Sequence, residues 1–228
     1  MTKQAVTINE ALDRFVAANP SHDRNGVVDL LRSYLDGYAY ELLEPAERAR
    51  WEAAYERDEE AGAFCNLFGP EHILEGLDVF LGWFMIRKVL GPPDVVSAAG
   101  PVCSDLVEWL VVEGYVDAAA ADGGRELAAA AERDLPLAEE LSSVLYDAAR
   151  EEAGPALEVV DWESEMAEVF RIERGKLWFR SELGEIGPVL VPDRATDIAR
   201  IGWGVSALAF AKSSAGWRIA EIGNVYPS

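Results

Sequence analysis

The sequence predicts an α+β protein, in which an N-terminal all-α helical domain is followed by a small C-terminal antiparallel β-barrel-like domain. Residues 1–156 contain 30 acidic and 12 basic residues, whereas residues 157–228 contain 11 and 8. Near the same boundary, an Ala-, Glu- and Leu-rich composition typical of helices changes to short β-prone runs separated by glycine. We therefore expect an acidic helical domain over residues 1–155 and a β-rich domain over residues 160–228, joined by a linker that begins at Gly154-Pro155.

Apolar residues that recur at helical spacing predict three helices near the N-terminus. Prolines mark the boundaries, because proline is tolerated in the first turn of a helix but disrupts its interior. The expected helices cover about residues 8–18, 25–43 and 46–61.

A wide apolar arc predicts that the next helix, over residues 71–90, forms the core of the helical domain. Charged residues within this pattern, among them Glu75 and Asp78, suit an amphipathic helix better than a membrane span. After Gly91-Pro92-Pro93 we expect one or two turns over residues 94–99, a helix over residues 102–113 and a last helix over residues 137–150.

Short β-prone runs predict five strands beyond residue 162. Glu173-Arg174-Gly175 carries the signal of a tight turn between the first two strands, and Asp193 can cap a short helix before the fourth. A bent sheet or barrel is favoured, because an open sheet this small would expose two edges. The expected strands cover residues 167–172, 176–182, 189–191, 205–212 and 216–226.

The net charge and the two cysteines indicate which partners and which cellular compartment to expect. The formal net charge of −21 repels phosphate backbones, so we expect no nucleic-acid partner. We expect no membrane partner either, because the longest apolar stretch carries charged residues. Cys65 and Cys103 lie in apolar surroundings, which favours two buried thiols in a reducing compartment over a disulfide. The first 19 residues lack the uninterrupted apolar region of a signal peptide. These observations predict a cytoplasmic protein.

The sharpest metal-like cluster is Glu71-His72-x-x-Glu75, because residues three apart on a helix project to the same side. His72 and Glu75 would supply only half of a site, since a second pair on a partner helix would be needed. The alternative, which we favour, is that these acids complement the dipole at a helix N-terminus. We therefore predict no metal and no other cofactor.

The spacing of helix and turn signals in residues 94–116 is that of a helix-turn-helix, with Gly100 as the turn, and this spacing resembles that of winged-helix domains. The would-be reading helix presents Asp105, Glu108 and Glu113 but no Arg, Lys, Asn or Gln, the side chains that usually read base edges. A packing role is therefore the stronger interpretation.

Four aromatic residues of the β-rich domain are the candidate binding residues. On a small barrel they could form a platform for peptides or bases, or they could fill its interior. They are Trp178, Trp203, Trp217 and Tyr226.

No catalytic signature is present, so we identify no catalytic residue. The leading hypothesis is a non-enzymatic cytoplasmic adaptor or regulatory protein that binds another protein through its β-rich domain or its acidic helical surface. One alternative is a metal-binding protein or enzyme built around Glu71, His72 and Glu75, and another is a degenerate helix-turn-helix regulator using residues 94–116. The sequence does not indicate an oligomeric state.

Overall fold

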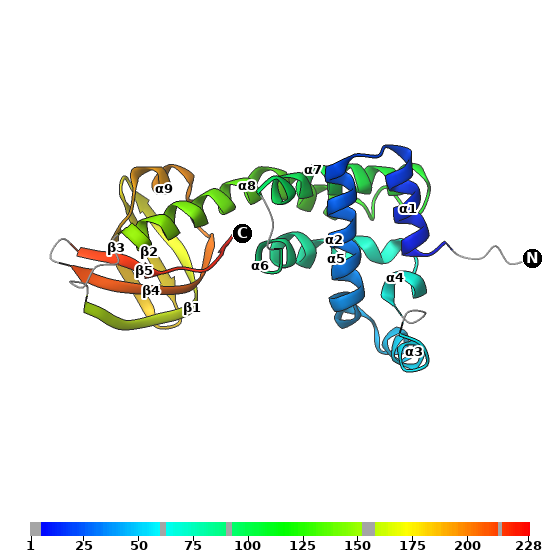
Figure 1. The fold of residues 1–228 in the computed structure, drawn as a ribbon, viewed down its shortest axis with the longest axis horizontal. Coiled ribbons are helices and arrows are strands. Elements are labelled where there is room, and N and C mark those ends of the chain that lie inside the picture. Colours follow the sequence, from blue (N-terminus) through cyan, green and yellow to red (C-terminus); the bar gives the residue numbers. More distant parts are fainter. Residues whose placement is uncertain (1–5, 60–62, 90–92, 152–157, 214–215) are drawn as a thin grey trace, which may run out of the picture. The chain divides into compact units, whose positions relative to one another are not determined.

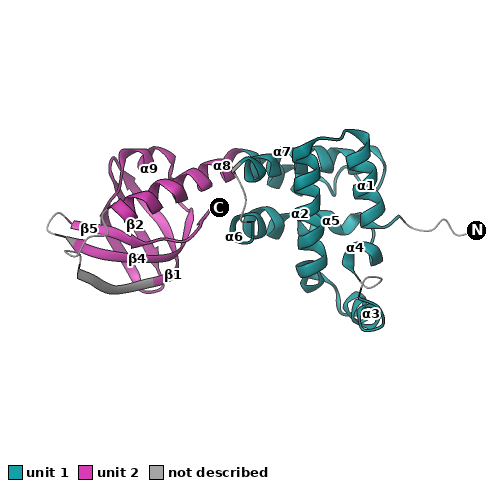
Figure 2. Ribbon diagram, in the orientation of Figure 1, with its two compact units in different colours: residues 1–132 teal, residues 133–228 magenta. Residues whose placement is uncertain are grey.

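The computed structural model describes residues 6–59, 63–89, 93–151, 158–213 and 216–228 (Figure 1). The chain divides into two compact units, which we call the helical unit (residues 1–132) and the barrel unit (residues 133–228) (Figure 2). The helical unit carries 24 acidic and 10 basic residues, and the barrel unit 17 and 10. The fold is α+β, as the sequence predicts.

Helices account for all the regular structure in the described part of the helical unit. The first begins at a capping box, in which the Thr7 hydroxyl accepts from the Glu10 N–H and the Glu10 carboxylate accepts from the Thr7 N–H. The elements are α1 (Ile8–Ala18), α2 (His22–Tyr38), η1 (Ala39–Leu42), α3 (Pro45–Tyr55), α4 (Phe64–Leu67), α5 (Glu71–Val79), η2 (Phe80–Phe84), α6 (Met85–Arg87), α7 (Pro93–Val112) and the first part of α8 (Asp122–Glu151).

The helix predicted over residues 71–90 is a run of α5, η2 and α6, with the π-helical segment η2 in its middle. Ile73, Leu77 and Phe80 are each 0% exposed, so this run forms the centre of the unit as predicted. Tyr34 of α2 packs its ring on Phe80 at a centroid distance of 5.8 Å. Its burial, with two nearby carboxylates, raises the pKa of Tyr34 to about 12.

The turn expected at Gly100 is absent, because α7 is a single helix that continues through Gly100 and Pro101. Gly100 lies against α8 so closely that an added Cβ would come within 3.0 Å of the backbone N and Cα of Glu132. Glycine is thus present for a close approach of two helices and not for a change of chain direction. The helix-turn-helix interpretation of residues 94–116 loses its structural basis.

By length and composition, one helix in the described part of the chain could cross a membrane, namely residues 94–112 with a mean hydropathy of 1.5. The signal is weak, since the core helix of a soluble protein passes the same test. Two acids of this helix are ion-paired, Asp105 with Arg24 and Glu108 with Arg125.

Helix α8 was expected only over residues 137–150 and wholly within the helical domain. It covers 30 residues, and the two compact units meet between Glu132 and Arg133, inside the helix. The physical reason is that its second half belongs to the core of the barrel, through buried Ala138, Leu141 and Leu145. The linker predicted from Gly154-Pro155 falls largely outside the described residues, and separate folding of two domains stays a prediction.

The barrel unit contains a closed five-stranded barrel with a sixth strand on its edge. The strand order is β1-β2-β3-β5-β4, and β1 pairs with β4 to close the barrel. All pairings are antiparallel except β3 with β5, which is parallel. The elements are β1 (Glu158–Glu173), β2 (Lys176–Ser181), β3 (Gly184–Leu190), α9 (Asp193–Ile198), β4 (Gly204–Ser213), β5 (Gly216–Glu221) and β6 (Val225–Tyr226).

The turn predicted between the first two strands is present. β1 ends at Glu173 and β2 begins at Lys176, and Gly175 between them has a φ of 71°, a conformation that glycine adopts without steric cost. Alternate residues of the strands point inward, such as Leu177, Phe179 and Val205, all 0% exposed. The second half of α8 packs on this interior and completes its core.

Candidate functional site

The strongest candidate site is a set of outward-facing side chains on β1, β2 and β3 of the barrel unit, which we call the Arg/aromatic face. Because Leu177 and Phe179 of β2 point inward, Trp178 and Arg180 point outward on the opposite side of the strand. Strand register places Arg171 of β1 opposite Trp178 and Glu168 opposite Arg180. Phe170 completes the face.

Two irregularities of the strands meet at this face. The β1–β2 register shifts between Val169 and Arg171, so that Phe170 is an extra residue of β1. The β2–β3 register shifts on the other side of Trp178. Gly187 of β3 lies there, and an added Cβ would come within 3.0 Å of the indole ring. The indole therefore packs directly on the backbone of Gly187, and two bulges position the side chains around it.

Each aromatic ring of the face is covered by an arginine. The guanidinium carbon of Arg171 lies 4.5 Å from the ring of Trp178, and that of Arg180 lies 4.5 Å from the ring of Phe170. Arginine stacks on aromatic faces because the ring quadrupole attracts its charge and its planar group is weakly hydrated. Trp178 and Phe170 are half-buried beneath these guanidinium groups.

The same two arginines make ion pairs at the surface. Arg171 pairs with Glu173, and Arg180 Nη2 donates to Glu185 Oε1 over 2.9 Å. The arginine side chains keep 57% and 51% of their surface exposed, so solvent weakens these pairs and the guanidinium groups retain exposed edges. The face presents aromatic carbon, exposed cation and carboxylate side by side, a composition suited to binding.

The four aromatic residues predicted as binding candidates are not gathered on one face. Trp178 is on the Arg/aromatic face. Trp203 is 2% exposed and belongs to the barrel core. Trp217 is partly buried against the same core, with Lys212 Nζ 5.5 Å from its ring centroid. Tyr226 is half-buried on β6 and pairs with Gly204 of β4.

The metal-like cluster is a set of contacts within the helical unit. His72 Nδ1 lies 2.8 Å from Glu75 Oε2, and His72 Nε2 lies 3.6 Å from Glu47 Oε1 on α3. The two carboxylates thus flank opposite ring nitrogens and cannot meet at one ion. Phe64 and Phe68 contact the imidazole edge-on. Across the described residues, no group of three or more His, Cys, Asp or Glu side chains is arranged to hold a metal ion.

Both cysteines are buried free thiols in the helical unit. Burial raises the pKa of Cys103 to about 12. Burial, together with the nearby Asp36 carboxylate, also raises the pKa of Cys65, whose backbone N–H donates to Asp36 Oδ1 over 2.8 Å. A thiol held in its protonated form is a poor nucleophile, so neither cysteine has the environment of a catalytic one.

Comparisons with known proteins give no further lead, because no family model, no curated protein and no solved structure matches this chain.

Sequence reasoning missed three members of the Arg/aromatic face, namely Phe170, Arg171 and Arg180. A signal was present, since Phe170-Arg171 and Trp178-Phe179-Arg180 place aromatic and basic residues on both sides of a predicted hairpin. The register that brings them together depends on the bulge at Phe170, which a pattern of alternation does not reveal.

Proposed function

We propose that the protein is a non-enzymatic cytoplasmic adaptor or regulator that binds a partner protein through the Arg/aromatic face of its barrel unit. The observation that carries this proposal is the pair of arginine-covered aromatic rings, Trp178 with Arg171 and Phe170 with Arg180, on a barrel surface shaped by two bulges. Trp and Arg are the residues most enriched at the energetic centres of protein interfaces.

The charge around the face supports a protein partner over a nucleic acid. Glu168, Glu173 and Glu185 accompany the two arginines, and the barrel unit as a whole has 17 acidic and 10 basic residues. A phosphate backbone would meet these carboxylates, whereas a protein surface of mixed charge can pair with both signs. A protein partner can also bind while each guanidinium stays on its aromatic ring, whereas a stacking base would have to displace the guanidinium.

The test also covers a second class of ligand, single-stranded nucleic acid. Greek-key barrels of the OB type bind oligonucleotides and oligosaccharides on the outer face of their second and third strands, and Trp178 and Gly187 lie on those two strands here. That likeness concerns architecture alone, and architecture does not establish function. Single-stranded DNA is therefore included as a competing probe.

The experiment is selection of a random peptide library on the purified full-length protein, followed by titration of the selected peptides against variants. We expect Trp178→Ala and Arg171→Gln each to weaken binding by about tenfold or more, the loss for a residue at an interface centre. The matched controls are Ile201→Ala and Arg194→Gln, exposed residues of the same unit outside the face, which should bind as the wild type does.

Circular dichroism of each variant will establish that the barrel is intact. The proposal is wrong if peptides selected on the wild type bind both face variants unchanged. It is also overturned if oligo-dT binds the face with a dissociation constant below about 1 μM and a steep salt dependence, because the face would then be a nucleic-acid site.

A further inference from the structure

Two aromatic side chains of the helical unit, Tyr38 and Trp83, meet at its surface, and we call them the ring pair. Tyr38 ends α2, and Trp83 belongs to the π-helical segment η2. Their ring centroids lie 5.3 Å apart and their planes are inclined by 72°. Both side chains are half-buried, so the two rings form an angled surface that keeps part of its area in contact with solvent.

Neighbouring aromatic residues hold the ring pair in place. Tyr34, which is buried, stacks on Tyr38 at a centroid distance of 6.3 Å, and buried Phe84 contacts the Tyr38 ring edge-on at 5.7 Å. Trp83 is positioned by the π-helical segment, a form of helix that proteins use rarely and often at functional sites. The ring pair is therefore ordered before any ligand arrives, which lowers the entropic cost of binding.

The ring pair already attracts an ammonium group from the chain itself. Lys88, an exposed residue that follows α6, places its Nζ atom 5.5 Å from the ring centroid of Trp83 and 5.8 Å from that of Tyr38. Both distances are within the range of about 6 Å over which a ring face attracts a cation. Lys212 of the barrel unit, by comparison, lies over the single ring of Trp217.

The charges around the ring pair also favour a cation. Asp78 and Glu41 lie near Tyr34, and together with the burial of that side chain they raise the pKa of Tyr34 to about 12. Because Tyr34 stacks on Tyr38, the negative potential of these two carboxylates acts next to the ring pair. The ring faces themselves are negative, so the carboxylates and the aromatic quadrupoles attract the same kind of ligand.

We propose that the ring pair binds a methylated ammonium group, and that the side chain of Lys88 occupies the ring pair when this ligand is absent. A primary ammonium is compact and strongly hydrated, so it loses favourable hydration when it approaches a ring. A methylated ammonium has the same charge, is less hydrated and covers more of the ring surface, which is why aromatic groups recognise it. The exposed Lys88 side chain can move aside without disturbing the core.

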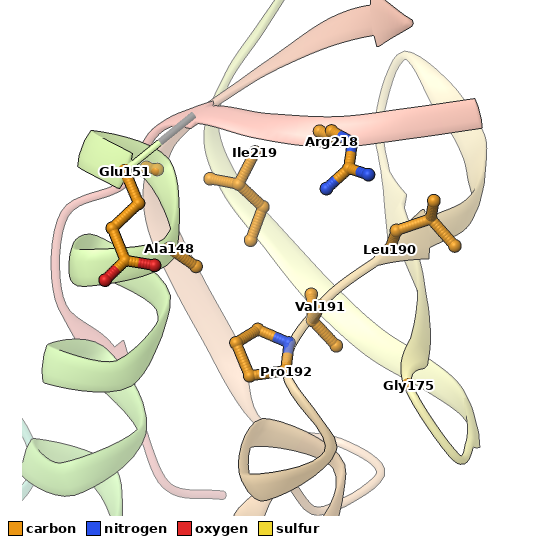
Figure 3. Close-up of a pocket in the computed structure, with 9 residues that line it drawn as sticks. Ala148, Glu151, Gly175, Leu190, Val191, Pro192, Arg218 and Ile219 are labelled. Carbon is orange, nitrogen blue, oxygen red and sulfur yellow. The ribbon is translucent and has the colours of Figure 1, made fainter. Parts of the chain in front are cut away.

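The cleft of the barrel unit has a different lining (Figure 3). Its volume is about 360 Å³, and Val191, Pro192 and Ile219 are among the residues that line it. None of the described residues in its lining is aromatic. A methylated ammonium is therefore expected at the ring pair and not in this cleft.

The test is an NMR titration of the full-length protein with choline, followed through the indole N–H resonance of Trp83, which the variant Trp83→Phe assigns. We expect choline to shift this resonance with a dissociation constant of about 0.1–10 mM, as suits a small ligand. The uncharged molecule of the same shape, 3,3-dimethylbutanol, should bind at least tenfold more weakly, because it lacks the charge that the rings attract. This comparison is made on the wild-type protein and does not depend on the folding of a variant.

A second ligand distinguishes the two sources of such a group. The amide of acetylated trimethyllysine carries the head group as it occurs on a protein side chain, whereas choline carries it on a small molecule. Tighter binding of the lysine derivative assigns the site to a methylated protein, and tighter binding of choline assigns it to a small molecule. If neither ligand shifts the Trp83 resonance, the proposal is refuted.

Variants then test the role of Lys88. A cation–π contact at an exposed site changes occupancy by a factor of about two to five, so Lys88→Ala should strengthen choline binding by about three- to sixfold. Lys212→Ala is the matched control and should bind as the wild type does. Tyr38→Leu removes one ring and should weaken binding by about tenfold or more. The proposal also fails if 3,3-dimethylbutanol binds as choline does, or if Lys88→Ala binds choline no more tightly than Lys212→Ala.

Discussion

Gly100 provides a direct test of the helical unit, because two opposite effects are expected from Gly100→Ala. Alanine is more favourable than glycine in a helix interior by about 1 kcal/mol, so an isolated α7 would be stabilised. In the folded protein, an added Cβ would lie within 3.0 Å of backbone atoms of Glu132, whereas ordinary contact begins at 3.4 Å. Backbone atoms cannot rotate away as a side chain can, so α7 and α8 would have to separate by roughly an ångström.

Overpacking of this kind costs about 1–3 kcal/mol, and the contact with backbone places Gly100→Ala toward the upper part of that range. Gly26→Ala in α2 is the matched control, because no atom lies within 4 Å of an added Cβ there. We expect the control to gain up to about 1 kcal/mol from helix propensity and from the lower entropy of the unfolded chain. The two variants should therefore differ in sign.

Urea unfolding followed by far-UV circular dichroism and tryptophan fluorescence measures both variants. For a chain of this size, each kcal/mol also shifts the melting temperature by about 2–4 °C, which gives an independent readout. If Gly100→Ala were as stable as Gly26→Ala, the close approach of α7 to α8 at Glu132 would be refuted. The explanation of why the helix continues through Gly100 would fail with it.

Three further outcomes are expected. Leu77→Ala should lower the free energy of unfolding by about 2–5 kcal/mol, because Leu77 is 0% exposed, and a loss below about 1 kcal/mol would place it outside the core. Arg24→Met should lower the free energy of unfolding by about 1–3 kcal/mol, since Arg24 is 7% exposed and pairs with Asp105 at 2.6 Å. Asp13→Asn, at the exposed pair with Arg32, should lower it by under about 1 kcal/mol, and equal losses would contradict this ranking. Burial raises the pKa of Cys103 from 9.0 to about 12 in the folded state, so between these pH values the unfolded chain loses the thiol proton first and the free energy of unfolding falls as pH rises, by up to about 1.4 kcal/mol per pH unit. Urea titrations at several pH values should show a shallower fall for Cys103→Ala than for the wild type, and parallel curves would count against the burial of this thiol.

Local patterns in the sequence were sufficient for the elements whose form depends on near neighbours. The apolar spacing over residues 8–18 places α1 correctly, and the glycine at residue 175 specifies the turn between β1 and β2. The bent sheet followed from the number and shortness of the strands, because so small an open sheet would leave two edges unpaired. These features rest on backbone propensities and on spacings of two or 3.6 residues.

Distant contacts decided the rest. Gly100 was expected to be a turn because glycine favours one, and only the neighbouring α8 shows that it serves a close packing of helices. The second half of α8 has an ordinary amphipathic pattern, and that pattern does not state which core its apolar side faces. The Arg/aromatic face likewise depends on a one-residue shift at Phe170, and such a shift moves side chains between the two faces of a sheet. The sequence therefore located most of the helices and strands, but not the first half of α8 or the continuity of α7 through Gly100. The tertiary structure decided which surfaces these elements share, because packing partners lie far apart along the chain and leave no periodic signal in it.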